Sequence, residues 1–147
     1  MRRTTRLVAA LVTAACLLAA CGAGDAAEPG PMGVGRGVYG SLCHTCHGSR
    51  GQGGTGPALA EVHLDFPTCA EQIEWIHLGS NKWREAHGDM YGARDKPIQG
   101  GMPSMEETFS GEEIAAVALF ERVEYGGRPL EATAADCEVE LPPPATG

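Results

Sequence analysis

"YGSLCHTCHGSRGQGGTGPAL", residues 39–59, gathers two cysteines, two histidines and six glycines into one short segment of the chain. Two residues separate Cys43 from Cys46, and His47 follows Cys46 directly. In a C-x-x-C-H pattern the two thiols can add to the two vinyl groups of a haem while the histidine ligates the iron. The segment therefore predicts one covalently attached haem c, held by Cys43 and Cys46, with His47 as the proximal iron ligand and His44 as an exposed spacer.

Two other kinds of site use a C-x-x-C pattern. Zinc takes four ligands, and neither a second C-x-x-C nor a pair of histidines at a zinc spacing follows in this sequence. A thioredoxin-type redox pair is followed by a helix, whereas the sequence after His47, "GSRGQGGTG", has too many glycines to begin one. A lipoprotein whose cysteines bind structural zinc stays open as the weakest interpretation.

The first 22 residues, "MRRTTRLVAALVTAACLLAACG", predict an export signal, because three arginines precede an apolar run at residues 7–20 that ends in small side chains. That run is shorter than the roughly 20 residues of a membrane-spanning helix. "LAAC", residues 18–21, resembles the lipobox of bacterial lipoproteins, which implies a lipid on Cys21. The alternative is ordinary cleavage nearby, with Cys21 left as a free thiol or lost with the leader.

The residues after the signal fit the lipid-anchored interpretation. Residues 21–32 are rich in glycine, alanine and proline, a composition typical of a flexible tether. With residues 1–20 as the signal peptide, the sequence predicts an exported protein anchored to the outer face of a bacterial cytoplasmic membrane.

The cysteine count leaves one further pair. One of the six cysteines lies in the signal, Cys21 is assigned to the lipid, and two belong to the C-x-x-C-H motif. Outside the cytoplasm, two remaining cysteines commonly pair. We therefore expect a disulfide between Cys69 and Cys137.

Length and charge limit the function. A chain of 147 residues has room for one modest domain with a single core. Its 19 acidic residues against 11 basic ones argue against binding to nucleic acid. Removal of the three arginines of the signal changes the formal charge from −8 to −11, so any charged partner is expected to present a basic docking face.

The sixth coordination position of a haem iron decides what the haem can do. Met102 is the favoured ligand, because "IQGGMPSM", residues 98–105, reads as a loop and gives a methionine little reason to be core filler. The other candidates for the sixth ligand are Met90, Met105, His63, His77 and His87. Each of these histidines also has an ordinary interpretation, as a residue of the surface or of a polar segment.

Two helices are predicted from local sequence signals. "FSGEEIAAVALFERVEYGG" predicts a helix over residues 111–125, with a capping box at Ser110 and Glu113. "PTCAEQIEWIHLGS" predicts another over residues 69–78, capped by Thr68 with Glu71 at its third position. A further short helix is expected before the motif, and long loops elsewhere.

Taken together, these features resemble class I cytochromes c over about residues 33–127. Gly35 and Tyr39 occupy positions where that family crosses its first and last helices, and "GGMP" precedes a capped terminal helix. The resemblance is greatest to small bacterial monohaem domains related to the cytochrome subunits of terminal oxidases. It implies an all-α cytochrome c fold at residues 33–130, a Pro57 carbonyl that accepts a hydrogen bond from His47, and Met102 as the axial ligand. Residues 131–147 would form a C-terminal extension with a disordered end.

The resemblance implies an electron carrier and not an enzyme. A haem with both axial positions filled has no open site for substrate, so it would pass single electrons to redox partners, in particular a membrane respiratory complex. The alternative is a gas sensor or peroxide-reactive haem protein with a displaceable sixth ligand. Between the two helices, Trp83 and Tyr91 could donate hydrogen bonds to haem propionates or simply pack at the haem edge.

Overall fold

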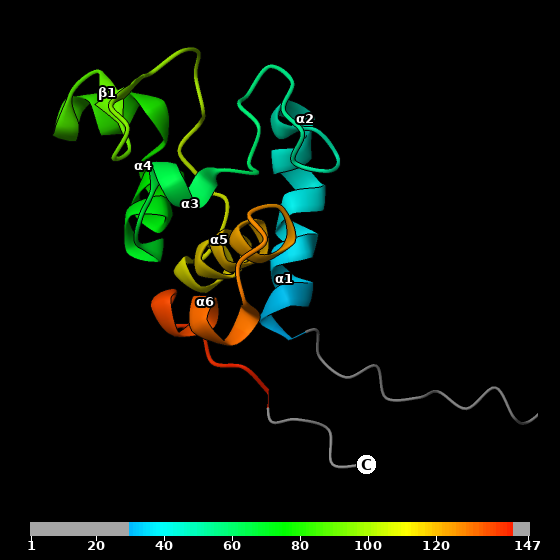
Figure 1. Cartoon of the computed structure of the whole chain (residues 1–147). Coiled ribbons are helices and arrows are strands. Elements are labelled where there is room, and N and C mark those ends of the chain that lie inside the picture. The colour runs from blue at the N-terminus through cyan, green and yellow to red at the C-terminus, as the bar shows by residue number, and fades with distance from the viewer. Residues whose placement is uncertain (1–29, 143–147) are drawn as a thin grey trace, which may run out of the picture.

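The computed structural model describes residues 30–142, and these form a bundle of helices joined by long loops (Figure 1). The predicted signal peptide, Cys21 and nearly all of the predicted tether lie outside the described residues, as does the end of the C-terminal tail. Within residues 30–142 the strands are limited to one hairpin, and none of the helices has both the length and the hydrophobicity that a membrane span needs. The elements are α1 (Pro31–Val38), η1 (Tyr39–Cys43), α2 (His44–His47), α3 (Val62–Asp65), α4 (Cys69–His87), β1 (Met90–Tyr91), β2 (Lys96–Pro97), α5 (Gly111–Glu124) and α6 (Leu130–Asp136).

The first three elements make one continuous helical rod from residue 31 to residue 47 (Figure 1). Pro31 stands in its first turn, where its missing N–H group costs no hydrogen bond. Residues 39–43 form a π-helical turn, and the rod ends at Gly48, whose φ of 78° suits glycine. The helix expected before the motif therefore exists and carries the motif in its last turns.

The rod crosses α5 at Gly35. A Cβ atom at this position would lie 2.7 Å from Cβ of Phe120 and would collide with the carbonyl oxygen of Ala116. Tyr39, one turn further on, packs its ring against Phe120 and Tyr125, with ring centroids 5.7 and 5.0 Å apart. The close helix crossing predicted at Gly35 and Tyr39 is thus present in the structure.

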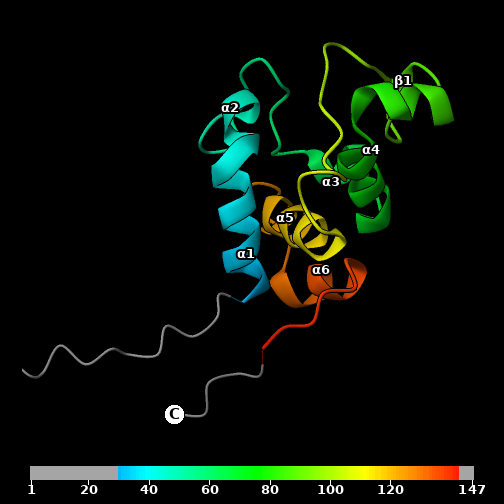
Figure 2. The same cartoon turned by 180° about the vertical axis from the view of Figure 1, so that it is seen from behind.

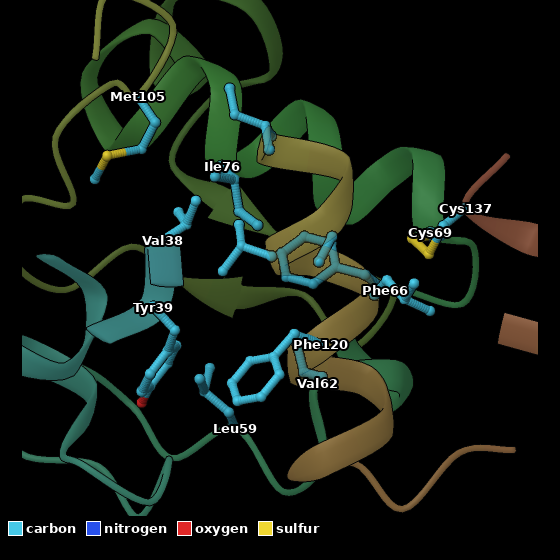
Figure 3. Packing of buried hydrophobic residues seen from close by; sticks show 14 of the residues in the cluster. Val38, Tyr39, Leu59, Val62, Phe66, Cys69, Ile76, Met105, Phe120 and Cys137 are labelled. Carbon is cyan, nitrogen blue, oxygen red and sulfur yellow. A yellow bond between two sulfur atoms is a disulfide. The ribbon is translucent and has the colours of Figure 1, made fainter. Parts of the chain in front are cut away.

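Helix α5 forms the centre of the core. It begins with the predicted capping box, in which Ser110 accepts a hydrogen bond from the Glu113 N–H and the Glu113 carboxylate accepts one from the Ser110 N–H. The core packs around this helix from the rod, the loop after the motif and α4 (Figure 3). Its fully buried members on α5 are Ile114, Val117, Ala118 and Leu119.

Helix α4 is much longer than the sequence predicted. Its Thr68 and Glu71 capping box is present, but the helix does not end near Leu78. It kinks at Gly79, where φ is 64° and ψ is −179°, and continues to His87. The expected end was wrong because a leucine followed by glycine, serine and asparagine reads as a helix stop, whereas contacts from a distant loop support the kink.

The C-terminal helix α6 is fastened over the start of α4. Cys69 and Cys137 form a disulfide with their Cα atoms 4.9 Å apart, and both side chains are buried (Figure 3). The Asp136 carboxylate accepts a hydrogen bond from the Cys69 N–H at 2.9 Å and pairs with the Arg122 guanidinium at 3.2 Å. The chain after residue 130 therefore packs as part of the bundle up to α6.

A layer of aromatic rings covers α4 on the side of the β1–β2 hairpin. Tyr91 stacks on Trp75 with ring centroids 4.6 Å apart, and Trp83 meets Trp75 edge-on at 5.3 Å. The Trp83 indole N–H donates to the Met90 carbonyl at 2.9 Å, so this donor is used inside the protein. Trp83 therefore does not have the free N–H that hydrogen bonding to a haem propionate would need.

Candidate haem site

The two motif cysteines project from neighbouring turns of the rod. Residues three apart on a helix lie on one face, so the spacing of Cys43 and Cys46 places both sulfurs on the same side. Both thiols are free; Cys43 is half-buried and packs against the hydrophobic core, whereas Cys46 is exposed. His44, between them, is exposed, as predicted. The pair can therefore hold a group that leans against the core on one side and meets solvent on the other.

His47 is oriented by the loop that follows it. Its Nδ1 atom lies 2.8 Å from the carbonyl oxygen of Pro57. Because a carbonyl only accepts, Nδ1 must carry the proton, which leaves the lone pair of Nε2 free to bind a metal. A Cβ atom at Gly56 would come within 3.0 Å of the imidazole, so the backbone packs directly on the ring. The ring is thus held in the tautomer that an iron ligand needs.

The glycine-rich loop is itself tied to the end of the rod. The Gly53 N–H donates to the His47 carbonyl at 2.8 Å, and the Gly56 N–H donates to the Cys46 carbonyl at 3.0 Å. The Tyr39 hydroxyl also donates to the Gly48 carbonyl, at 2.6 Å. These bonds give an otherwise irregular loop a defined path, which places the Pro57 carbonyl beside His47.

The environment of Cys43 does not suit the attacking thiol of a redox pair. Burial, helped by the charge of Glu121, raises the pKa of the Cys43 thiol to about 12. A thiol that keeps its proton is a poor nucleophile, whereas the attacking thiol of a redox pair needs a lowered pKa. Among residues 30–142, no group of three or more His, Cys, Asp and Glu side chains stands close enough to hold a metal ion. The described residues therefore offer no zinc site either.

The three candidate methionines have different environments. Met105 is buried at 4 % exposure in the hydrophobic core, where Figure 3 shows it on the same side of the cluster as Val38 and Ile76. Met90 lies on the hairpin and is 44 % exposed. Met102 is half-buried in the loop between β2 and α5 and touches the core cluster from outside. Of the three, only Met102 combines partial burial with an irregular, glycine-flanked backbone.

The candidate histidines have partners or surroundings of their own. Nε2 of His77 lies 2.8 Å from the Glu106 carboxylate, and Nε2 of His87 lies 2.9 Å from the Glu74 carboxylate. The Glu106 carboxylate also pairs with Lys82. His63 buries Nδ1 without a hydrogen-bond partner, and burial lowers its pKa. Two of the three histidines are thus engaged on the surface of α4.

Two polar groups near the site could not be identified from the sequence. Glu121 is 5 % exposed on α5 and accepts a single hydrogen bond, from Nε2 of Gln72 at 2.8 Å. Ser80 is 2 % exposed and hydrogen-bonds to Met102. A surface cavity of about 390 Å³ lies between α4 and the hairpin; its lining includes the alternative ligand candidates His87 and Met90 but not Cys43, Cys46, His47 or Met102.

The described residues fit a covalent haem. Two free thiols share one helix face, an adjacent imidazole keeps Nε2 available, and a half-buried thioether lies on a loop against the same core. The two thiols and the imidazole are the groups that c-type haem attachment requires, and a thioether is one of the groups that can serve as a further axial ligand.

Comparison with known proteins leads to the same conclusion. No curated protein matches the chain. A family model described as cytochrome c oxidase, cbb3-type, subunit III, matches residues 30–120, which is well over half of the sequence and runs from the rod into α5. The chain therefore belongs to this family, with an all-α cytochrome c domain that binds a covalent c-type haem iron and transfers electrons.

Proposed function

We propose that the chain is a single-electron carrier with His47 and Met102 as axial ligands, working in a membrane-associated respiratory chain. The observation that carries the ligand assignment is the contrast among the methionines: Met105 fills the core, Met90 lies on an exposed hairpin, and Met102 stands half-buried on a loop. The bound haem would supply one-electron chemistry by cycling between Fe(II) and Fe(III).

The protein's own residues would set the properties of this carrier. A hydrogen bond from Nδ1 of His47 to the Pro57 carbonyl fixes the tautomer and the orientation of the ring. A thioether in place of a second imidazole raises the reduction potential. The tight loop contacts around His47 leave little room for rearrangement, so the same ligands can serve both oxidation states.

We further propose that redox partners dock through a basic face. Residues 30–142 contain 17 acidic and eight basic side chains, which supports long-range attraction of a cationic partner. The segment that bears the motif, residues 30–60, contains no acidic residue, so the attraction comes from the more distant helices and not from contact at the motif. Reduction rates that fall steeply with added salt would support a basic partner, and salt-independent rates would refute it.

The lipid anchor at Cys21 and the location on the outer face of a bacterial cytoplasmic membrane are part of the same proposal. They rest on the three arginines, the apolar run and the "LAAC" segment of the sequence. The family name suggests an oxidase complex as the partner. The chain would either donate electrons to that complex or be one of its subunits.

The test of the ligand assignment is the visible spectrum of the haem-loaded protein, ferric and ferrous, with and without carbon monoxide, beside Met102→Ala. The proposal expects a low-spin wild type that does not bind carbon monoxide and a variant that does. A wild type that binds carbon monoxide readily has an accessible iron and would instead favour a gas sensor or peroxide-reactive protein. Met105→Ala is the matched control, since loss of a core side chain should lower stability without opening the iron.

A further inference from the structure

The kink in α4 lies where the backbone of a distant loop, residues 103–104, packs against the helix. At Gly79 the backbone enters the left-handed region, with φ at 64°. A Cβ atom there would lie 2.5 Å from the carbonyl carbon of Pro103 and from the backbone nitrogen of Ser104. Both the dihedral angle and the close approach require glycine. The interruption of α4 thus makes room for the backbone of the loop that carries Met102.

The residue after the kink binds Met102 twice. The Ser80 N–H donates to the Met102 carbonyl at 2.8 Å, and the Ser80 Oγ accepts from the Met102 N–H at 2.9 Å. Ser80 is buried at 2 % exposure, so water does not compete freely for these bonds. One residue therefore satisfies both backbone polar groups of Met102.

The two residues that precede Met102 in this loop have few contacts that would hold them. Gly100, with φ at 83°, and Gly101 precede Met102, and added Cβ atoms at these two glycines would meet nothing within 4 Å. Beyond Met102 the loop is fixed again, because the Ser104 hydroxyl donates to the His77 carbonyl at 2.8 Å. Ser80 is thus the residue that fixes the backbone of Met102 itself.

We propose that the Gly79–Ser80 kink is a positioning device that holds Met102 in place for the haem iron. This inference rests on the proposed function, in which Met102 is the sixth ligand. A loop that holds its thioether in place lowers the fraction of molecules with an open iron. An external ligand binds only that open fraction, so its apparent affinity falls as the fraction falls. Loss of the hydroxyl of Ser80 should therefore make the iron easier to reach even though Ser80 does not touch it.

The experiment measures imidazole affinity of the ferric, haem-loaded protein in wild type, Ser80→Ala, Met102→Ala and the double variant. One net hydrogen bond corresponds to about a fivefold change in the open fraction, so Ser80→Ala should bind imidazole about fivefold more tightly than wild type. In the Met102→Ala background the same substitution should change the affinity by less than twofold, because no thioether remains to be positioned. Carbon monoxide binding to the ferrous forms should follow the same order.

Ser104→Ala is the matched control, because it removes a serine hydrogen bond between the same loop and α4 without touching Met102. It should leave imidazole affinity within twofold of wild type. If Ser80→Ala does not fold, Ser80→Cys keeps the shape with a weak acceptor and should shift the affinity in the same direction.

The outcomes separate the two proposals. If Met102→Ala opens the iron but Ser80→Ala matches wild type, or matches Ser104→Ala, the positioning role is refuted and the ligand assignment stands. An equal effect of Ser80→Ala with and without Met102 also refutes positioning. If Met102→Ala binds imidazole no better than wild type, the ligand assignment fails, and the positioning role fails with it.

Discussion

The buried carboxyl of Glu121 leads to a quantitative prediction about stability and pH. Burial raises its pKa from 4.5 to about 8 in the folded protein, since its only hydrogen bond comes from Gln72 and no cation faces it. The neighbouring Arg122 points away, toward the carbonyls of residues 66–68 and the side chains of Gln72 and Asp136. The other titratable groups near Glu121 are Tyr39, Tyr125 and Cys43, none of which is positively charged.

The sign follows from proton counting. Between the two pKa values the folded chain holds a proton on Glu121 that the unfolded chain has released. Stability therefore falls as pH rises through this range and levels off above the folded pKa. Each pH unit is worth about 1.4 kcal/mol, and the slope decreases close to the folded pKa, so about 2 to 3 kcal/mol should be lost between pH 5.5 and pH 7.5 through this group alone.

The perturbation is Glu121→Gln, which keeps the shape and the acceptor for Gln72 but cannot ionise. The assay is guanidinium unfolding of the haem-loaded protein at both pH values. Wild type should lose about 2 to 3 kcal/mol more than the variant over this interval, while Glu124→Gln, which changes an exposed carboxyl on the same helix, should behave as wild type. Equal losses in wild type and Glu121→Gln would refute the idea that Glu121 is protonated in the folded state.

Three other substitutions follow from the structure. Gly35→Ala should lower the free energy of unfolding by about 2 kcal/mol or more, because the added Cβ has no space against α5. Gly37→Ala, in open space on the same helix, should be neutral or slightly stabilising. Equal effects of the two substitutions would contradict the close helix crossing. The double substitution Cys69→Ser and Cys137→Ser should cost about 4 kcal/mol, as expected for a closed loop of this length, and an unchanged unfolding midpoint would contradict it. Cys21→Ser should move the exported protein from the membrane fraction to the soluble fraction, and retention in the membrane would rule out the lipid anchor.

The features that local sequence patterns predicted correctly are those set by residues close to one another in the chain. The haem motif and the two capping boxes are set by residues within a few positions of one another, and the structure has both boxes. The crossing at Gly35 and the bond from His47 to Pro57 were inferred from family resemblance, and both contacts are present. Local signals and a shared pattern therefore covered the centre of the site.

The rest depended on distant contacts. Gly79 looked like the end of a helix, because nothing nearby shows that residues 102–104 would fill the kink. The burial of Glu121 is equally hidden: a glutamate on a helix is usually exposed, and only the packing of Gln72 from α4 explains its position. The sequence favoured Met102 over Met105 only through its glycine-flanked setting, since both lie in one short loop, and the burial of Met105 in the core became visible only in the structure.

The two ends of the described chain lie together, which matters for anyone who attaches something to this protein. A Cβ atom at Gly30 would come within 3.5 Å of the Pro142 ring, and both views show these ends on the opposite side of the bundle from α2 (Figures 1 and 2). Along the rod, 12 residues, or about 18 Å, separate Pro31 from Cys43, the first residue of the motif. A fluorescent reporter or electrode linker fused at either end would therefore sit far from the haem and leave its edge open. Copies joined in tandem by short linkers would, for the same reason, keep their haems apart and behave as separate carriers rather than as a wire.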